Sequence, residues 1–322
     1  TRRQRQMCIR DSNDTSAIGS AHYLATLAEL KAGELSASPE IEFGTIANRF
    51  PGTAAALLAE MKQADFCALN QDECAENAGQ WFHRITGRSS ARALSESATF
   101  KEALVAFLDG QYSMSIELLQ KMLRTSQSGT LQEQAQALLI QLIPDEIERL
   151  LDAGLDIEAI VIAQQNRTFF EKGWLDESLL FQIGLAFERL TMHSEALQLF
   201  LYLRNRSTVL DEESLLFATI RAAHALGSYY LVEDLAFEYS YRHPEGAHEL
   251  DVLFFRLDCM YAAGQIDEAL QLMPEPLPQR LDFRILGATL HFKKKQYQLT
   301  AGILLPVYQF QRDKLSADTL YI

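Results

Sequence analysis

The sequence lacks long apolar runs and has few basic residues. No stretch approaches the roughly 18 uncharged apolar residues of a membrane-spanning helix, so we expect no transmembrane segment. Its 322 residues carry 29 Lys and Arg against 43 Asp and Glu, a net charge of −14. Such an acidic excess disfavours a nucleic-acid backbone or an anionic membrane as partner. It is compatible with a soluble protein, or with a basic or apolar partner.

The motifs of common enzyme sites are also missing. The sequence has no Gly-rich phosphate loop followed by Lys and Ser or Thr, and no G-x-S-x-G nucleophile motif. His248-Glu249 is not followed by the second His of a zinc-protease helix, and His243 and His248 flank what we interpret as a solvated loop. We therefore expect no catalytic residue, no cofactor and no metal site.

Cysteine is scarce. Of the four cysteines, Cys67 and Cys74 are close enough in sequence to pair across a helix end, and Cys259 lies in an apolar helical pattern typical of a core. Cys67 and Cys74 are either two reduced thiols or a disulfide, and a disulfide would imply an oxidising compartment.

The first twelve residues resemble translated sequencing-adapter read-through, so we treat residues 1–12 as non-native and leave them out of the fold argument. They contain four arginines and one aspartate, and without them the net charge moves from −14 to −17. We expect the chain to be a fragment, truncated at one or both ends.

The sequence repeats itself internally. The pentapeptide E-S-L-L-F at 177–181 recurs unchanged at 213–217, and E-A-L-Q-L at 195–199 recurs at 268–272. These offsets of 36 and 73 correspond to one and about two periods. A period in the mid-thirties is typical of stacked helical repeats.

Apolar periodicity predicts helices throughout, irregular over 13–92 and regular over 93–322. In the regular region, short turn elements separate pairs of helices, which must then be antiparallel hairpins. These turn elements are Gly110, Gly154, Thr191-Met192-His193, Gly227, Gly264 and Lys293-Lys294-Lys295-Gln296. Small residues follow in the second helices at Ser115, Ala159, Ala196, Ala269 and Thr300. The lysine run is either a solvated turn or a docking point for an acidic partner.

In a 34-position frame that begins at Glu177, Gly184 takes the eighth position, Ala196 the twentieth and Phe200 the twenty-fourth. By these residues the chain resembles the tetratricopeptide repeat family, whose helix–turn–helix unit has about 34 residues. The resemblance covers 93–322 and implies an all-α, right-handed α-solenoid of stacked antiparallel helix hairpins. Ile220 departs from it, because it occupies a position that is usually small.

The resemblance also implies an inner groove lined by the second, fifth, ninth and twelfth positions of each first helix. Spacings of three, four and three put four side chains on one helical stripe. The residues at these positions are Ser178, Phe181, Leu185, Glu188, Ser214, Phe217, Arg221, His224, Asp251, Phe254, Asp258 and Tyr261. Three of them, Phe181, Phe217 and Phe254, either pack between adjacent first helices or form an aromatic floor for a bound peptide.

The function that the resemblance implies is a non-catalytic scaffold that binds a peptide or partner protein in the concave groove. The alternatives are the accessory α-superhelical arm of a larger enzyme, as in soluble lytic transglycosylases, or the sensor region of a regulator. We expect a bacterial chain from the periplasm or cell envelope, with the cytoplasm as the alternative. The envelope predicts an oxidised Cys67–Cys74 pair, and the cytoplasm predicts free thiols. The sequence carries no signal for an oligomeric state.

Overall fold

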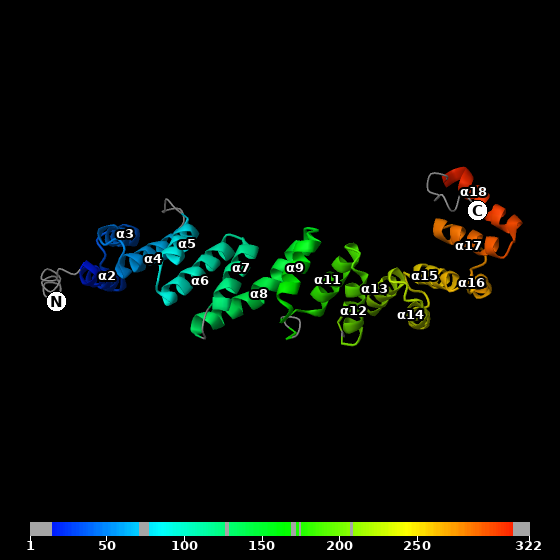
Figure 1. The fold of residues 1–322 in the computed structure, drawn as a ribbon, viewed down its shortest axis with the longest axis horizontal. Coiled ribbons are helices and arrows are strands. Elements are labelled where there is room, and N and C mark those ends of the chain that lie inside the picture. Colours follow the sequence, from blue (N-terminus) through cyan, green and yellow to red (C-terminus); the bar gives the residue numbers. More distant parts are fainter. Residues whose placement is uncertain are drawn as a thin grey trace. The chain divides into compact units, whose positions relative to one another are not determined.

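The computed structural model describes residues 15–70, 77–125, 129–168, 172–173, 175–206 and 209–311. Every regular element in these ranges is an α-helix, sixteen in all, so the predicted all-α class is confirmed (Figure 1). None of the described helices combines the length and the apolar character needed to cross a bilayer. Residues 1–12 and Cys74 lie outside the described ranges.

The chain divides into two compact units, Thr1–Glu146 and Ile147–Ile322, and the division falls inside a helix. Unit 1 contains α2 (Thr15–Ala32), α3 (Pro39–Arg49), α4 (Ala54–Leu69), α5 (Ala78–Arg88), α6 (Arg92–Leu108), α7 (Tyr112–Thr125) and the first part of α8 (Thr130–Asp152). Helix α6 begins at Arg92, one residue before the predicted start of the regular array. The array as a separate domain stays a prediction.

Unit 2 continues with α9 (Asp156–Gln165), α11 (Glu177–Arg189), α12 (His193–Arg204), α13 (Glu212–Ala225), α14 (Tyr229–Arg242), α15 (Glu249–Ala262), α16 (Ile266–Leu272), α17 (Leu281–Lys293) and α18 (Tyr297–Gln311). We call α11, α13, α15 and α17 the A helices, and α12, α14, α16 and α18 the B helices. Each A helix packs against its own B helix and also against the next A helix along the chain. Contacts confined to neighbours are those of stacked hairpins, as predicted.

The predicted turns are confirmed, and they share one backbone motif. One residue in each takes a positive φ, between 58° and 78°: Gly110, Gly154, Thr191, Gly227, Gly264 and Lys295. The amide of the next residue then donates to the carbonyl five positions back, as Met192 does to Phe187 and Ser228 does to Ala223. This is the Schellman bond that satisfies the open carbonyls at a helix end. A tight reversal into the next helix follows.

The small residues predicted in the second helices lie where paired helices cross. Ser115, Ala159, Ala196, Ala269 and Thr300 are all buried. The Ser115 hydroxyl donates to the Ala103 carbonyl at 2.8 Å, so a helix backbone lies directly against this position. Larger side chains at these positions would separate the two helices.

Candidate partner-binding site

The twelve residues predicted to line a groove lie on three consecutive A helices, α11, α13 and α15, and we call them the A-helix stripe. Ser178 is exposed, the other eleven are partly buried, and none is fully buried. Because α11 contacts α13 and α13 contacts α15, the three segments of the stripe lie side by side.

Aspartate caps set the starts of the first two A helices. Asp176 Oδ1 accepts a hydrogen bond from the Leu179 amide at 2.7 Å, and Asp211 Oδ2 accepts one from the Ser214 amide at 2.8 Å. Each carboxylate satisfies an amide that the first helical turn leaves without a partner. Hydrogen bonds from Ser214 also hold the pKa of Asp211 below its ordinary value.

The third A helix is held at its start by a tyrosine from the preceding B helix. The buried hydroxyl of Tyr239 donates to Glu213 Oε1 at 2.5 Å and accepts the His248 amide at 3.0 Å. Burial, followed by the bond to Glu213, raises the pKa of Tyr239. A Cβ at Gly246 would lie 2.4 Å from this hydroxyl, so only glycine fits there. The arrangement positions the His248 ring over α13.

Charged residues of the stripe pair across neighbouring A helices in one repeating register. Arg221 Nε and Nη2 donate to the Glu188 carboxylate at 3.0 and 2.5 Å, which raises the pKa of Arg221. One repeat later, His224 Nε2 and Asp258 Oδ2 are 2.8 Å apart. In both pairs the twelfth position of one A helix meets the ninth of the next. The structure thus brings together residues that the sequence placed only on a common face.

The aromatic residues of the stripe find partners outside it. Phe181 packs on Phe200 of its own B helix, with ring centroids 5.6 Å apart. Phe217 stacks on His248 at 3.8 Å with the two planes 2° apart, and its next neighbour is Phe255 at 6.2 Å. Phe255 was missed from sequence because it lies one position beyond the predicted stripe.

The third phenylalanine of the stripe belongs to a core. Phe254 packs against the buried Phe283 ring of α17 at 5.6 Å, and Tyr261 joins the same cluster. Asp251 also reaches this region, since its Oδ1 lies 2.8 Å from Arg280 Nη1. All three phenylalanines therefore contribute to helix packing, and the aromatic floor for a peptide stays a prediction.

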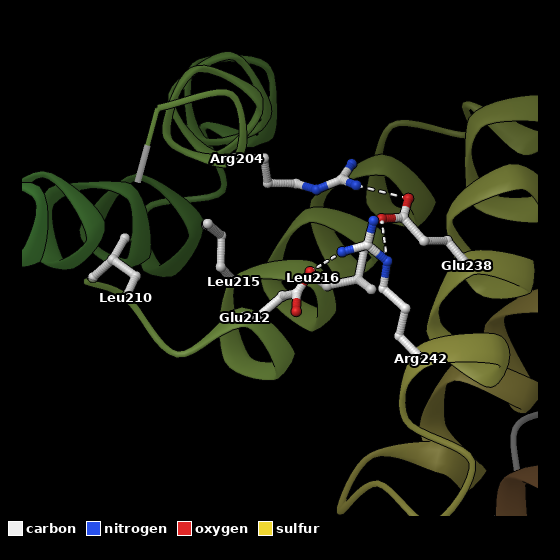
Figure 2. A pocket seen from close by; sticks show the side chains of 7 residues that line it. All are labelled: Arg204, Leu210, Glu212, Leu215, Leu216, Glu238 and Arg242. Atoms are coloured by element: carbon white, nitrogen blue, oxygen red, sulfur yellow. Dashed lines mark hydrogen bonds and ion pairs between the residues drawn. The ribbon is translucent and has the colours of Figure 1, made fainter. Parts of the chain in front are cut away.

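A pocket on another face of unit 2 was not predicted from the sequence. It has a volume of about 330 Å³ and is lined by Arg204, Leu210, Glu212, Leu215, Leu216, Glu238 and Arg242 (Figure 2). Arg204 Nη2 donates to Glu238 Oε2 at 2.7 Å, and Arg242 lies between Glu238 and Glu212 and pairs with both. Two arginines thus face two carboxylates, so the lining is neutral. The 34-residue spacing of Arg204 and Glu238 is the one sequence signal for this contact.

The cysteines and the lysine run give no further site. Cys67 takes part in a disulfide, but pairing with Cys74 stays a prediction because Cys74 lies outside the described residues. Cys259 is a free, buried thiol, and burial raises its pKa to about 12. Lys294 pairs with Asp267 at 2.7 Å. Within the described ranges, no group of three or more His, Cys, Asp or Glu residues is arranged to hold a metal ion.

No family model matches the chain, and no curated protein matches it. The chain is similar to solved structures that contain tetratricopeptide repeats. A tetratricopeptide repeat protein from Parabacteroides merdae is 12% identical, with 80% of this chain and 94% of that chain covered and a TM-score of 0.35. The second is a signal transduction ATPase with numerous domains and a tetratricopeptide repeat sensor, from Pyrococcus horikoshii. It is 10% identical, the comparison covers 94% of this chain and 47% of that chain, and the TM-score is 0.40. The description of this chain as an array of helix hairpins rests on its own helices and their contacts.

Proposed function

We propose that unit 2 is a non-catalytic protein-interaction scaffold that binds a peptide or partner protein along the A-helix stripe. The observation that carries this proposal is the repeated pairing of Glu188 with Arg221 and of His224 with Asp258. These pairs satisfy the charges of the stripe within the protein. Apolar side chains of the stripe, such as Leu185, stay partly buried and can still be covered.

Affinity in such a site comes from apolar anchors, and selectivity comes from the charged rim. Glu188 is almost fully covered, whereas the Arg221 side chain keeps 43% of its surface exposed. A peptide can therefore contact the exposed part of Arg221 without breaking its bond to Glu188. We expect the stripe to prefer peptides rich in apolar residues.

The experiment is a peptide selection followed by affinity measurement. A phage-displayed random peptide library is selected on the full chain, and the best peptides are measured by fluorescence anisotropy. Ser178→Arg adds a long charged side chain to the exposed member of the stripe and should weaken binding at least tenfold. Gln198→Arg makes the same addition on the exposed face of α12 and should leave the affinity unchanged.

Thermal unfolding of both variants, followed by circular dichroism, separates lost binding from lost folding. Equal affinity of wild type and Ser178→Arg for every selected peptide would refute binding along the stripe.

A further inference from the structure

The B helix α14, labelled in Figure 1, carries an aromatic stripe that its own packing does not use. The side chains of Tyr230, Phe237 and Tyr241 are 91%, 67% and 82% exposed. Spacings of seven and four residues place them on one face of the helix, and Asp234 lies on the same face one turn from both Tyr230 and Phe237. We call Tyr230, Asp234, Phe237 and Tyr241 the α14 stripe.

Folding of the hairpin does not require this stripe. Helix α14 buries Val232, Leu235, Ala236 and Tyr239, which lie on its other side. The positions 36 residues earlier, on α12 and its C-cap, are occupied by Ser194, Gln198, Leu201 and Asn205, of which all but Leu201 are exposed. The same repeat therefore forms with a mainly polar face, and large exposed aromatic surface is a common mark of a binding site.

The charges around the α14 stripe leave one carboxylate uncompensated. Glu238 is paired with Arg204 and Arg242, and Glu233 lies 3.5 Å from Arg256. Asp234 is exposed and forms no ion pair with any residue in the described ranges. The stripe thus presents three aromatic rings around a single free negative charge.

We propose that the α14 stripe binds an amphipathic helix of a partner protein that carries arginine or lysine among its apolar residues. Cations are attracted both to tyrosine and phenylalanine faces and to a carboxylate. A guanidinium suits the site best because it stacks on a ring while donating two parallel hydrogen bonds. The distance from Tyr230 to Tyr241 along the helix is about 17 Å, or three turns of a partner helix.

Charge also argues against other occupants. The chain carries a net charge of −14, which opposes both an anionic membrane surface and a second copy of the chain. The α14 stripe lies on a B helix and the A-helix stripe on A helices, so the two surfaces can be tested independently.

The test needs a variant of α14 that still folds, so its substitutions are taken from the equivalent positions of the preceding repeat. The triple variant Tyr230→Ser, Asp234→Gln, Tyr241→Asn gives α14 the side chains found at the equivalent positions of α12. A phage-displayed library of helical peptides is selected on the full wild-type chain and counter-selected on the triple variant. We expect the selected peptides to be enriched in arginine or lysine beside apolar residues.

We expect these peptides to bind the triple variant at least tenfold more weakly than wild type, and the Ser178→Arg variant as well as wild type. Asp234→Asn alone should weaken binding about threefold and reduce its dependence on salt. Peptides without basic enrichment, or none that distinguishes the triple variant, would overturn the proposal. A dimer in light scattering, or binding to phosphatidylglycerol vesicles, that the triple variant abolishes would overturn it in favour of a second copy or a membrane.

Discussion

The hairpin of α11 and α12 and the hairpin of α13 and α14 contain the same pentapeptide at the start of their A helices. Their cores differ where the A and B helices cross. In the first, Gly184 lies so close to Phe200 that a Cβ would be 2.4 Å from the ring. In the second, the positions 36 residues on are Ile220 and Ala236, both buried. The first hairpin thus has its large side chain, Phe200, on the B helix, whereas the second has its large side chain, Ile220, on the A helix.

This difference in which helix carries the large side chain accounts for the different partners of the equivalent residues Phe181 and Phe217. Phe181 has the Phe200 ring within its own hairpin. Phe217 has Ala236 at the corresponding position, and it packs instead on His248 and Phe255 of the next hairpin. One aromatic residue therefore stabilises a hairpin internally, whereas its equivalent ties two hairpins together.

The largest expected effect comes from breaking the first of these two cores. Phe200→Ala removes a fully buried ring and should lower the free energy of unfolding by about 3–5 kcal/mol. Adding Gly184→Ile recreates the combination of the second hairpin and should recover about half of that loss. Urea unfolding of the single and double variants measures both values. If the double variant is less stable than Phe200→Ala alone, an isoleucine at position 184 does not replace the packing of the Phe200 ring.

The second-largest expected effect comes from the turns within the two hairpins. Thr191 takes a φ of 58° where the second hairpin has Gly227 at 66°. A left-handed conformation costs a residue with a Cβ roughly 1–2 kcal/mol, and glycine adopts it freely. Thr191→Gly should therefore stabilise the protein by about 1 kcal/mol, and Gly227→Thr should destabilise it by about 1–2 kcal/mol. Differential scanning calorimetry checks the opposite signs, and shifts in the same direction would contradict this account.

The smallest expected effect concerns the helix caps Asp176 and Asp211. Asp176 accepts a hydrogen bond from the amide of Leu179, whose side chain has no hydroxyl. Asp211, by contrast, accepts hydrogen bonds from both the hydroxyl and the amide of Ser214. Since these bonds lower the pKa of folded Asp211, its contribution is complete above the unfolded pKa of about 3.9 and is lost as the pH falls through the folded value.

Two substitutions at this cap separate its charge from its hydrogen bonds. Asp211→Asn keeps an acceptor without a titrating group, so it should flatten the loss of stability between about pH 5 and pH 2. Asp211→Ala should cost about 1 kcal/mol at neutral pH, because no acceptor remains for the amide. Urea unfolding at a series of pH values measures both, and an unchanged acid limb in Asp211→Asn would exclude this cap as a source of acid sensitivity.

Much of the fold could be predicted because its signals are local. The turn at Gly227 and the small residue Ala196 each follow from a few neighbouring residues and a period in the mid-thirties. The candidate site was harder to predict from the sequence. The bond between Glu188 and Arg221 joins residues 33 positions apart, and periodicity places both on one helix face without indicating that they meet. Phe255 escaped prediction because it lies one position beyond the predicted stripe.

The sequence by itself determined that this chain forms helices, where many of them end, and that they pair into repeated hairpins, because caps, turns and apolar spacing act within a single hairpin. Only the tertiary structure decided which ring each repeated phenylalanine meets, which charges cancel between helices, and that α14 keeps three aromatic side chains exposed. Those outcomes depend on the sizes and charges of residues about one repeat apart, which come together only when the hairpins stack.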